Sequence, residues 1–499
     1  MTKNAKRFVI LLVALLMCAT VVFAACNKAG FKPVEVPKAG QDVESNGGIA
    51  VRYGDWLYYV NGYESNVSAD NTYSDEVKTA PRIGSVVRIK LSEIASLFEI
   101  NDDKNISSTS EKNKQIAAKV REKAETVVPK VYYSGNTTTT QFTGIYIFNE
   151  RIYVTTPNDA LTANGDPRTD ELVLMSFNLG GGDPTSHFTF TSNSAQIWLS
   201  EVGNKVVATY LMDDVLHTLD VESGEDKVVT KEYGKLKHID NTVSSANWDE
   251  KGKAVFFIDE FGSICKLAVG QANYEVILEN DSYKDHGEHI EKGSKTFTIK
   301  FVNDGTVYYT KSDSEGAKDG GDVELYYATS ATDNDNTASL TNSVTLYGWK
   351  ENKNIAIMSA TSEQTYYGIS ILELKKDEGS EKLYKETVVL SPAFNTSSVT
   401  INKIEGDILY YTADGVSYTI DLNDVTKPDY NPNEQGTPYA KNLASTTGWA
   451  APDFIEFGDE YYIISLTTGA VTITKFDREN VKSNTVSVAL TLTAAPEEK

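Results

Sequence analysis

One pair of histidines has a spacing that could hold a metal ion. His286 and His289 lie in the run Asp285-His286-Gly287-Glu288-His289. Imidazole nitrogens together with a carboxylate, here Asp285 or Glu288, are ligands that zinc accepts. A solvated loop explains the same residues, because the run offers no clear third ligand. We therefore keep His286 and His289 as the candidate metal ligands and expect no cofactor.

The other acidic and glycine-rich stretches do not match a known catalytic or ion-binding pattern. Residues 313–322 and 333–336 are rich in oxygen ligands, but neither stretch has the spacing of a calcium-binding loop. A glycosidase needs a pair of carboxylates, and sequence alone cannot select two from 70 acidic residues. Motifs of serine hydrolases, zinc proteases, P-loop enzymes and dinucleotide-binding proteins are absent. The run Gly-Gly-Gly-Asp at 180–183 lies between predicted strands and is predicted to be a turn.

The first 26 residues carry the one chemical signal that is specific. Three basic residues precede the apolar run Phe8–Phe23, and two alanines separate this run from Cys26. A basic start, an apolar middle and small residues at the end are typical of a secretory signal. The apolar run is too short to favour a membrane-spanning helix, which needs about 20 residues. Residues 1–25 are therefore predicted to be an export signal that is removed.

The end of this segment, Phe23-Ala24-Ala25-Cys26, resembles the bacterial lipobox, in which small residues precede a cysteine. The resemblance implies that the Cys26 thiol receives a diacylglyceryl group, that the signal is cut before Cys26, and that the new amine is acylated with a fatty acid such as palmitate. Ordinary secretion with cutting after Ala24 is the alternative. Two acyl chains give stable anchoring, since each buried CH₂ contributes about 0.8 kcal/mol. We expect a lipoprotein on the extracytoplasmic face of the cell membrane.

The remaining cysteines agree with an exported chain. The sequence has three cysteines: Cys18 in the signal, Cys26 at the lipid site, and Cys265 in the body. Exported proteins usually carry cysteines in pairs or not at all. Cys265 lies in an apolar run and is predicted to be a buried strand residue, because a thiol packs as a small hydrophobe.

The charge of the chain restricts its partners. The net charge is −23, and removal of Lys3, Lys6 and Arg7 with the signal makes it −26. Nucleic acid and anionic lipid headgroups would repel such a surface, so neither is expected as a partner. Simple solubility accounts for the charge equally well.

A phrase made of a turn followed by an apolar strand recurs eight times. The middle of the strand falls at positions 58, 153, 207, 256, 308, 356, 410 and 461, spaced by 95 residues and then by 48 to 54. Hairpin turns followed by apolar strands predict a sheet. The phrases are Tyr53–Val60, Phe148–Val154, Val202–Ala208, Glu250–Phe257, Asn303–Tyr309, Glu351–Ile357, Glu405–Tyr411 and Phe457–Ile463.

Most units continue into a further strand, so each holds about four short strands. A four-stranded unit with this period is typical of a propeller blade. The phrases at Tyr53–Val60, Asp304–Tyr309 and Gly406–Leu422 resemble a family of bacterial surface propellers with Asp-Gly-Trp-Ile-Tyr-Tyr repeats. The resemblance implies the fold and little about activity. We predict an all-β chain, a β-propeller of seven or eight four-stranded blades over residues 48–490. The strand at 486–492 either closes the ring against the first unit or completes an eighth unit.

Residues 92–130 interrupt the strand pattern and are predicted to be a helical insertion. Ile116, Val120, Ala124 and Val127 form one apolar stripe at helical spacing, and Pro129 would end the helix. Packing on the rim of the ring is favoured over a partner-binding arm or a lid, and a disordered loop is a further alternative for the polar part.

The segments that flank the units have no apolar period. Residues 26–47 are predicted to be a spacer between lipid and domain, 426–438 a long loop, and 491–499 a polar tail.

Two functions fit this layout, and a third does not. A non-catalytic envelope module would bind a peptide, a glycan or another envelope protein. The alternative is an enzyme that acts on extracellular polysaccharide or peptide in the propeller channel. A transporter's substrate-binding protein would need alternating helices and parallel strands, which the pattern lacks.

Overall fold

The computed structural model describes parts of the chain between residues 33 and 493. The export signal, Cys26, His286, His289 and the acidic stretch 313–322 lie outside the described residues. The described ranges are 33–62, 83–100, 111–131, 134–136, 139–141, 143–161, 164, 167–230, 232–233, 236–237, 242–249, 252–280, 284–285, 290–291, 295–312, 325–332, 336–338, 345–350, 353–360, 366–374, 384–392, 396–414, 416–434, 436–441, 453–457, 460–467, 469–477 and 486–493.

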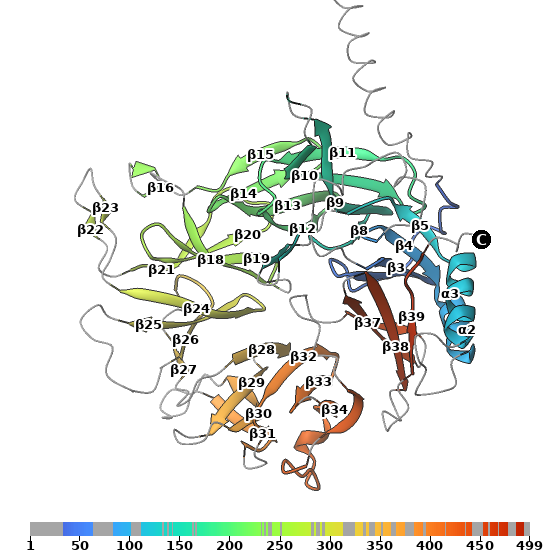
Figure 1. The fold of residues 1–499 in the computed structure, drawn as a ribbon. Coiled ribbons are helices and arrows are strands. Elements are labelled where there is room, and N and C mark those ends of the chain that lie inside the picture. The colour runs from blue at the N-terminus through green and yellow to red at the C-terminus, as the bar shows by residue number, and fades with distance from the viewer. Residues whose placement is uncertain are drawn as a thin grey trace, which may run out of the picture.

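Eight antiparallel sheets follow one another around a ring (Figure 1). This is an eight-bladed β-propeller, so the fold class is confirmed and the blade number is eight. Blade 1 has five strands: β1 (Val43–Glu44), β2 (Ala50–Tyr53), β3 (Trp56–Val60), β4 (Val86–Lys90) and β5 (Glu125–Val128).

The other seven blades have four strands each. Blades 2 to 4 are β8 (Tyr146–Phe148), β9 (Arg151–Leu161), β10 (Pro167–Asn178) and β11 (Thr185–Phe190); β12 (Gln196–Val202), β13 (Lys205–Met212), β14 (Val215–Asp220) and β15 (Glu225–Val228); β18 (Val243–Asp249), β19 (Ala254–Asp259), β20 (Ile264–Ala268) and β21 (Glu275–Leu278).

Blades 5 to 8 complete the ring. They are β24 (Thr296–Asn303), β25 (Thr306–Ser312), β26 (Leu325–Ala328) and β27 (Asn336–Ala338); β28 (Thr345–Lys350), β29 (Lys353–Ala360), β30 (Tyr366–Leu374) and β31 (Tyr384–Leu390); β32 (Val399–Glu405), β33 (Ile408–Ala413), β34 (Val416–Asp421) and β35 (Thr437–Lys441); β36 (Asp453–Phe457), β37 (Glu460–Thr467), β38 (Ala470–Asp477) and β39 (Val486–Ala489).

Three small hairpins and one short helix decorate the blades. The short 3₁₀ helix is η3 (Asp424–Thr426), which ends where the predicted long loop 426–438 starts. The hairpins are β6 (Ser134–Asn136) with β7 (Thr139–Gln141), β16 (Glu232–Tyr233) with β17 (Leu236–Lys237), and β22 (Lys284–Asp285) with β23 (Ile290–Glu291).

In every blade, the recurring phrase forms a hairpin turn and the strand that follows this turn, as its period predicts. Side chains alternate along a strand, so consecutive residues face opposite neighbours. Tyr308 packs with residues of blade 6, and Tyr309 packs with residues of blade 4. In blade 1, the Tyr58 hydroxyl donates to the Leu179 carbonyl of blade 2, and the Tyr59 hydroxyl donates to the Leu490 carbonyl beside blade 8. The phrase therefore supplies both walls of each blade-to-blade core.

The ring closes between blade 8 and blade 1 without a shared strand. Strand β39 pairs with β38, so it completes blade 8, which was one of the two predicted alternatives. Contact with blade 1 is made by the fully buried side chain of Asn61. Its Nδ2 donates to the Leu492 carbonyl at 2.8 Å, and its Oδ1 accepts from the Leu492 amide at 2.7 Å. The Asn61 side chain therefore donates and accepts a hydrogen bond across this junction, as a backbone residue does within an antiparallel sheet.

Two helices form the insertion, and their bounds differ from the predicted ones. They are α2 (Leu91–Ile100) and α3 (Glu111–Lys123), which pack on each other and against β39 (Figure 1). The single helix predicted to run to Pro129 is wrong at its end: residues 125–128 form β5, which pairs with β4. Strand pairing with β4 overrides the helical spacing of Val127, which is buried in the sheet. None of the helices in the described part of the chain is long and apolar enough to cross a membrane.

Tyr411→Ala should destabilise the ring by about 3 to 5 kcal/mol, as do other large-to-small core changes. Tyr410 and Tyr411 are both buried, and the Tyr411 hydroxyl also accepts a hydrogen bond from the Gly436 amide at 2.9 Å. If the insertion lay outside the ring, Val120→Ala would serve as the control. It cannot, because Val120 is fully buried in the core shared by blades 8, 1 and 2. Val202→Ala is the better control, because Val202 is 44% exposed. Denaturant midpoints that are equal for Tyr411→Ala and Val202→Ala would contradict the packing described here.

Candidate functional site: an N-terminal segment docked on blades 1 and 2

Residues 33–48, here called the N-terminal segment, lie against the ring instead of forming a free spacer. The Val34 amide donates to the Gly180 carbonyl of blade 2 at 2.9 Å. Further along, the Gly47 amide donates to the Ile145 carbonyl at 2.7 Å, and the Ile145 amide donates back to the Gly48 carbonyl at 2.9 Å. Between these points, β1 pairs with β2. The segment is thus bonded to blade 2 at both ends and to blade 1 in the middle.

Arg88, on β4, links the N-terminal segment to both blades. Its side chain is 1% exposed. Nε donates to the Glu125 carboxylate at 2.8 Å, Nη1 donates to the Leu179 carbonyl at 3.0 Å, and Nη2 donates to the Glu35 carbonyl at 2.5 Å. The planar guanidinium presents fixed donors in several directions, which a lysine could not reproduce. A single buried cation therefore ties together β5, the β10–β11 turn and the N-terminal segment.

Aromatic side chains of β3 enclose the Arg88 guanidinium. Its Cζ lies 4.2 Å from the centre of the Trp56 ring, which is a cation–π contact. Tyr58 shares the Leu179 carbonyl with Arg88, donating to it at 2.9 Å. Burial raises the pKa of Tyr58 to about 12, so its hydroxyl keeps the proton that this bond needs. These contacts exclude water from the charged group and strengthen its hydrogen bonds.

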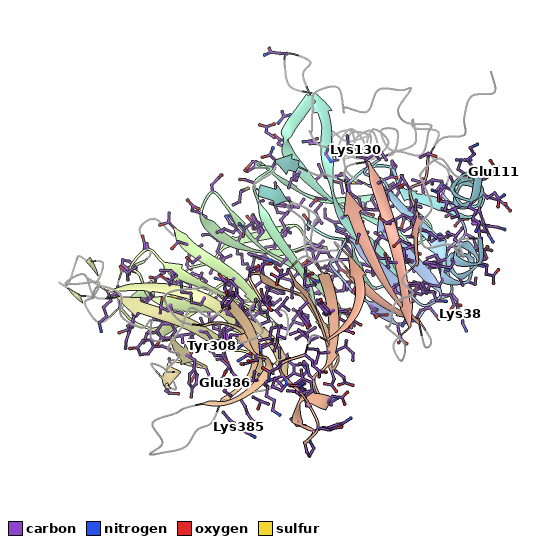
Figure 2. All side chains as sticks on the ribbon, turned by 60° about the horizontal axis from the view of Figure 1, so that its bottom comes forward. Lys38, Glu111, Lys130, Tyr308, Lys385 and Glu386 are labelled. Atoms are coloured by element: carbon purple, nitrogen blue, oxygen red, sulfur yellow. The ribbon has the colours of Figure 1, made fainter. Side chains whose placement is uncertain are left out.

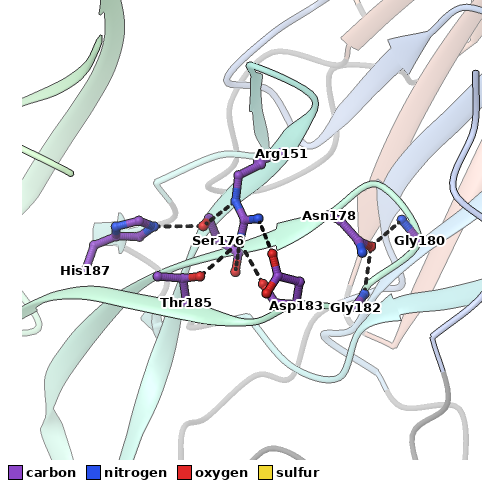
Figure 3. A network of polar contacts seen from close by, with 8 residues as sticks. All are labelled: Arg151, Ser176, Asn178, Gly180, Gly182, Asp183, Thr185 and His187. Carbon is purple, nitrogen blue, oxygen red and sulfur yellow. Dashed lines mark hydrogen bonds and ion pairs between the residues drawn. The ribbon is translucent and has the colours of Figure 1, made fainter. Parts of the chain in front are cut away.

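The turn that receives the N-terminal segment is Asn178–Asp183, the glycine run predicted to be a turn. The Asn178 Oδ1 accepts from the Gly180 amide at 3.0 Å and from the Gly182 amide at 2.8 Å (Figure 3). Gly180 must be glycine because a Cβ there would lie 2.2 Å from the Val34 carbonyl oxygen. The glycines therefore create the surface on which the N-terminal segment lies.

A second arginine fixes the far end of this turn. Arg151 donates to the Ser176 Oγ at 2.9 Å, to the Asp183 carboxylate at 2.7 Å and to the Asp183 carbonyl at 2.7 Å (Figure 3). A further bond joins Arg151 to the Thr185 hydroxyl at 3.1 Å. The turn is thus held by side chains of blade 2 itself, independently of Arg88.

Ser176 and His187 are arranged like a serine nucleophile and its general base. The His187 Nε2 lies 2.7 Å from the Ser176 Oγ, and its Nδ1 lies 3.0 Å from the Val221 carbonyl. A carbonyl accepts only from a protonated nitrogen, so Nδ1 carries the proton and Nε2 accepts from the serine, as in a nucleophile and its base. Ser176 is fully buried within a strand and also accepts from Arg151. This geometry fixes the turn and gives a substrate no access to the serine oxygen.

His187 should make stability depend on pH. Burial, assisted by the charge of Arg151, holds the pKa of His187 below its usual 6.5. Protonation then favours the unfolded chain, so its contribution is present above pH 6.5 and is lost as the pH falls below that value. We expect the free energy of unfolding of the wild type to fall more steeply than that of His187→Gln between pH 7 and 5. Parallel pH profiles in denaturant melts would rule this out.

The structure confirms the prediction made for Cys265, one of the residues singled out by sequence. Cys265 is fully buried on β20, with its thiol 3.5 Å from the Asp259 carboxylate. Cys26, His286 and His289 lie outside the described residues. Within the described ranges, no three histidine, cysteine or acidic side chains come together as a metal site. The predicted loop at 426–438 borders a cavity of about 290 Å³ beside Tyr430 and Asp424.

Sequence reasoning missed Arg88 and Arg151. The available signal was a cation within an otherwise apolar strand, as in Val86-Val87-Arg88-Ile89. A charge is almost never fully buried unless it is paired. Such a position therefore demands partners, but nothing in the sequence says that they are the carbonyls of Glu35 and Leu179.

Comparison with known proteins yields no relative by sequence. No family model matches the chain, and no curated protein matches it. Among solved structures, a prolyl endopeptidase matches with a TM-score of 0.38 and 13% identity, over 91% of this chain and 60% of that one. The β-propeller domain of the Trilobed protease from Pyrococcus furiosus matches with a TM-score of 0.37 and 11% identity, over 71% and 99%. BamB from Moraxella catarrhalis matches with a TM-score of 0.31 and 13% identity, over 68% and 83%. The chain spans only 60% of the prolyl endopeptidase that it matches, and its own eight sheets establish the propeller.

Proposed function

We propose that the protein is an acylated lipoprotein of the cell envelope, in which a rigid propeller is held at the membrane as a non-catalytic binding module. The observation that carries the proposal is the docked N-terminal segment. It meets the ring at Pro33 and Val34, seven and eight residues after Cys26. An anchor at Cys26 would then hold the whole propeller and not merely a flexible leader.

The inner strands supply a surface that suits a binding role. Trp198 on β12 and Trp248 on β18 are half-buried and stack with ring centres 5.9 Å apart and planes within 9°. Both belong to the first strands of neighbouring blades, 3 and 4. The part of each ring that is left exposed combines apolar surface with an indole N–H, a combination that is enriched at binding interfaces. A glycan or a peptide of the envelope is therefore the class of ligand that we propose.

Cys26→Ala tests the anchoring. We expect the wild type to partition into the detergent phase and the Cys26→Ala variant to leave it, because the thiol that takes the diacylglyceryl group is lost. Cys265→Ala is the matched control: Cys265 is buried within blade 4, so this variant should partition as the wild type does. Equal detergent partitioning of all three proteins would refute the proposal.

A further inference from the structure

The length of chain between Cys26 and the ring limits how the ring can stand at a membrane. Cys26 and Pro33 are seven residues apart, and seven extended residues span at most about 25 Å. If residues 33–48 were a free leader, 22 residues would separate Cys26 from Gly48, with a reach of roughly 75 Å. A reach of about 25 Å is shorter than the width of a domain of this size, so it restricts how the ring can turn. A reach of roughly 75 Å would let the ring turn freely.

The point where the N-terminal segment leaves the ring is fixed on blade 2. Pro33 lies against Gly182, since a Cβ on that glycine would be 3.2 Å from the Pro33 Cβ. The next residue is bonded to Gly180, and Glu35 is bonded to Arg88. Asn178 and Arg151 hold the turn by hydrogen bonds to Gly180 and Asp183 (Figure 3). The exit point therefore has the rigidity of blade 2 itself.

We infer that the docked N-terminal segment orients the ring on a lipid bilayer, with the Asn178–Asp183 turn of blade 2 towards the membrane and blades 5 and 6 away from it. This rests on the proposed acylation of Cys26. Charge does not attract the ring to the bilayer, because the mature chain of net charge −26 is repelled by anionic headgroups. The orientation comes from the docked segment alone, and it leaves the distal blades as the surface offered to partners in solution.

Two exposed positions report the orientation. Ser186 lies on β11, three residues beyond Asp183, and Lys385 lies on β31 of blade 6. In Figure 2, Lys385 lies at the lower edge of the molecule, and Lys38 of the N-terminal segment lies at the right. A fluorophore is attached to an azido amino acid that replaces Ser186 or Lys385, and the lipidated full-length protein is placed in phosphatidylcholine vesicles with a headgroup quencher. We expect several-fold stronger quenching at position 186 than at position 385.

Gly180→Ala supplies the matched variant. Its Cβ would overlap the Val34 carbonyl oxygen and displace the N-terminal segment, while Cys26 is untouched. The variant should still float with vesicles, but its two labels should be quenched more nearly equally. Equal quenching of the two labels in the wild type would overturn the inference.

Anchoring and orientation can fail separately. A second sample carries a maleimide lipid on the Cys26 thiol of the unacylated mature chain, which supplies the anchor whether or not cells do. Unequal quenching in this sample, with no flotation of the protein made in cells, would refute acylation and keep the orienting role of the segment. Equal quenching in this sample would refute the orienting role whatever the cell does.

Discussion

Deletion of residues 486–499 should abolish cooperative folding of the ring. The deletion removes β39 and the buried side chains of Val488, Leu490 and Leu492. Burying each such side chain contributes about 1.5 to 3 kcal/mol, and a domain has a net stability of only about 5 to 15 kcal/mol. It also removes the carbonyl that accepts from the Tyr59 hydroxyl and both hydrogen bonds between the Asn61 side chain and the Leu492 backbone. The loss is comparable to the whole stability, so we expect a broad, non-cooperative melt in calorimetry.

Deletion of residues 494–499 is the control for this experiment. It keeps β39, Leu492 and the Asn61 bonds, so the melting temperature should stay within a degree or two of the wild type. Asn61→Leu is the point variant that separates ring closure from strand loss. It leaves the Leu492 amide and carbonyl without partners, at a cost of about 1 to 3 kcal/mol each. A cooperative melt of the 486–499 deletion at the wild-type temperature would contradict the closure described here.

Arg88→Met should destabilise the protein by roughly 3 to 5 kcal/mol and release the N-terminal segment. The substitution keeps much of the side-chain volume but leaves the carbonyls of Glu35 and Leu179 without their charged donor. Lys38 is exposed, so trypsin should cleave after it faster in the variant than in the wild type, because cleavage follows local opening. Denaturant melts and the rate of cleavage after Lys38 measure the two effects.

Arg168→Met is the control for Arg88→Met. Arg168 lies on β10 of blade 2 and also pairs with a glutamate, Glu171, at 2.7 Å, but 42% of its side chain is exposed. Exposed pairs contribute about 0 to 1 kcal/mol. If the two variants lose equal stability and are cleaved after Lys38 at equal rates, the special role of Arg88 is refuted.

Strands buried on both faces were the part of the fold that sequence could predict. The apolar phrases such as Tyr308-Tyr309 face two neighbouring blades at once, so their residues must be apolar along the whole strand. Inner strands carry a weaker pattern because one edge faces the ring centre: β18 reads Val-Ser-Ser-Ala-Asn-Trp-Asp, with only its ends buried. The eight repeats correspond to eight blades because β39 pairs within blade 8.

The docked segment could not be predicted, and the reason is physical. Prolines, glycines and lysines without an apolar period are typical of a flexible spacer. Backbone hydrogen bonds hold residues 33–48, and any residue type except proline can donate such a bond. The decisive side chain, Arg88, is 53 residues from Glu35 and 91 residues from Leu179. Only the assembled ring brings these groups together.

Hydrogen exchange of the N-terminal segment, measured on the mature lipidated protein, tests the central claim most directly. The amides of Val34 and Gly47 are bonded to the carbonyls of Gly180 and Ile145, so exchange requires local opening. We predict that peptides covering residues 33–48 exchange over minutes to hours, as those of β3 do, and that Arg88→Met and Gly180→Ala both speed exchange near Val34. Complete exchange of residues 33–48 at the rate of an unstructured peptide in the wild type would contradict the account.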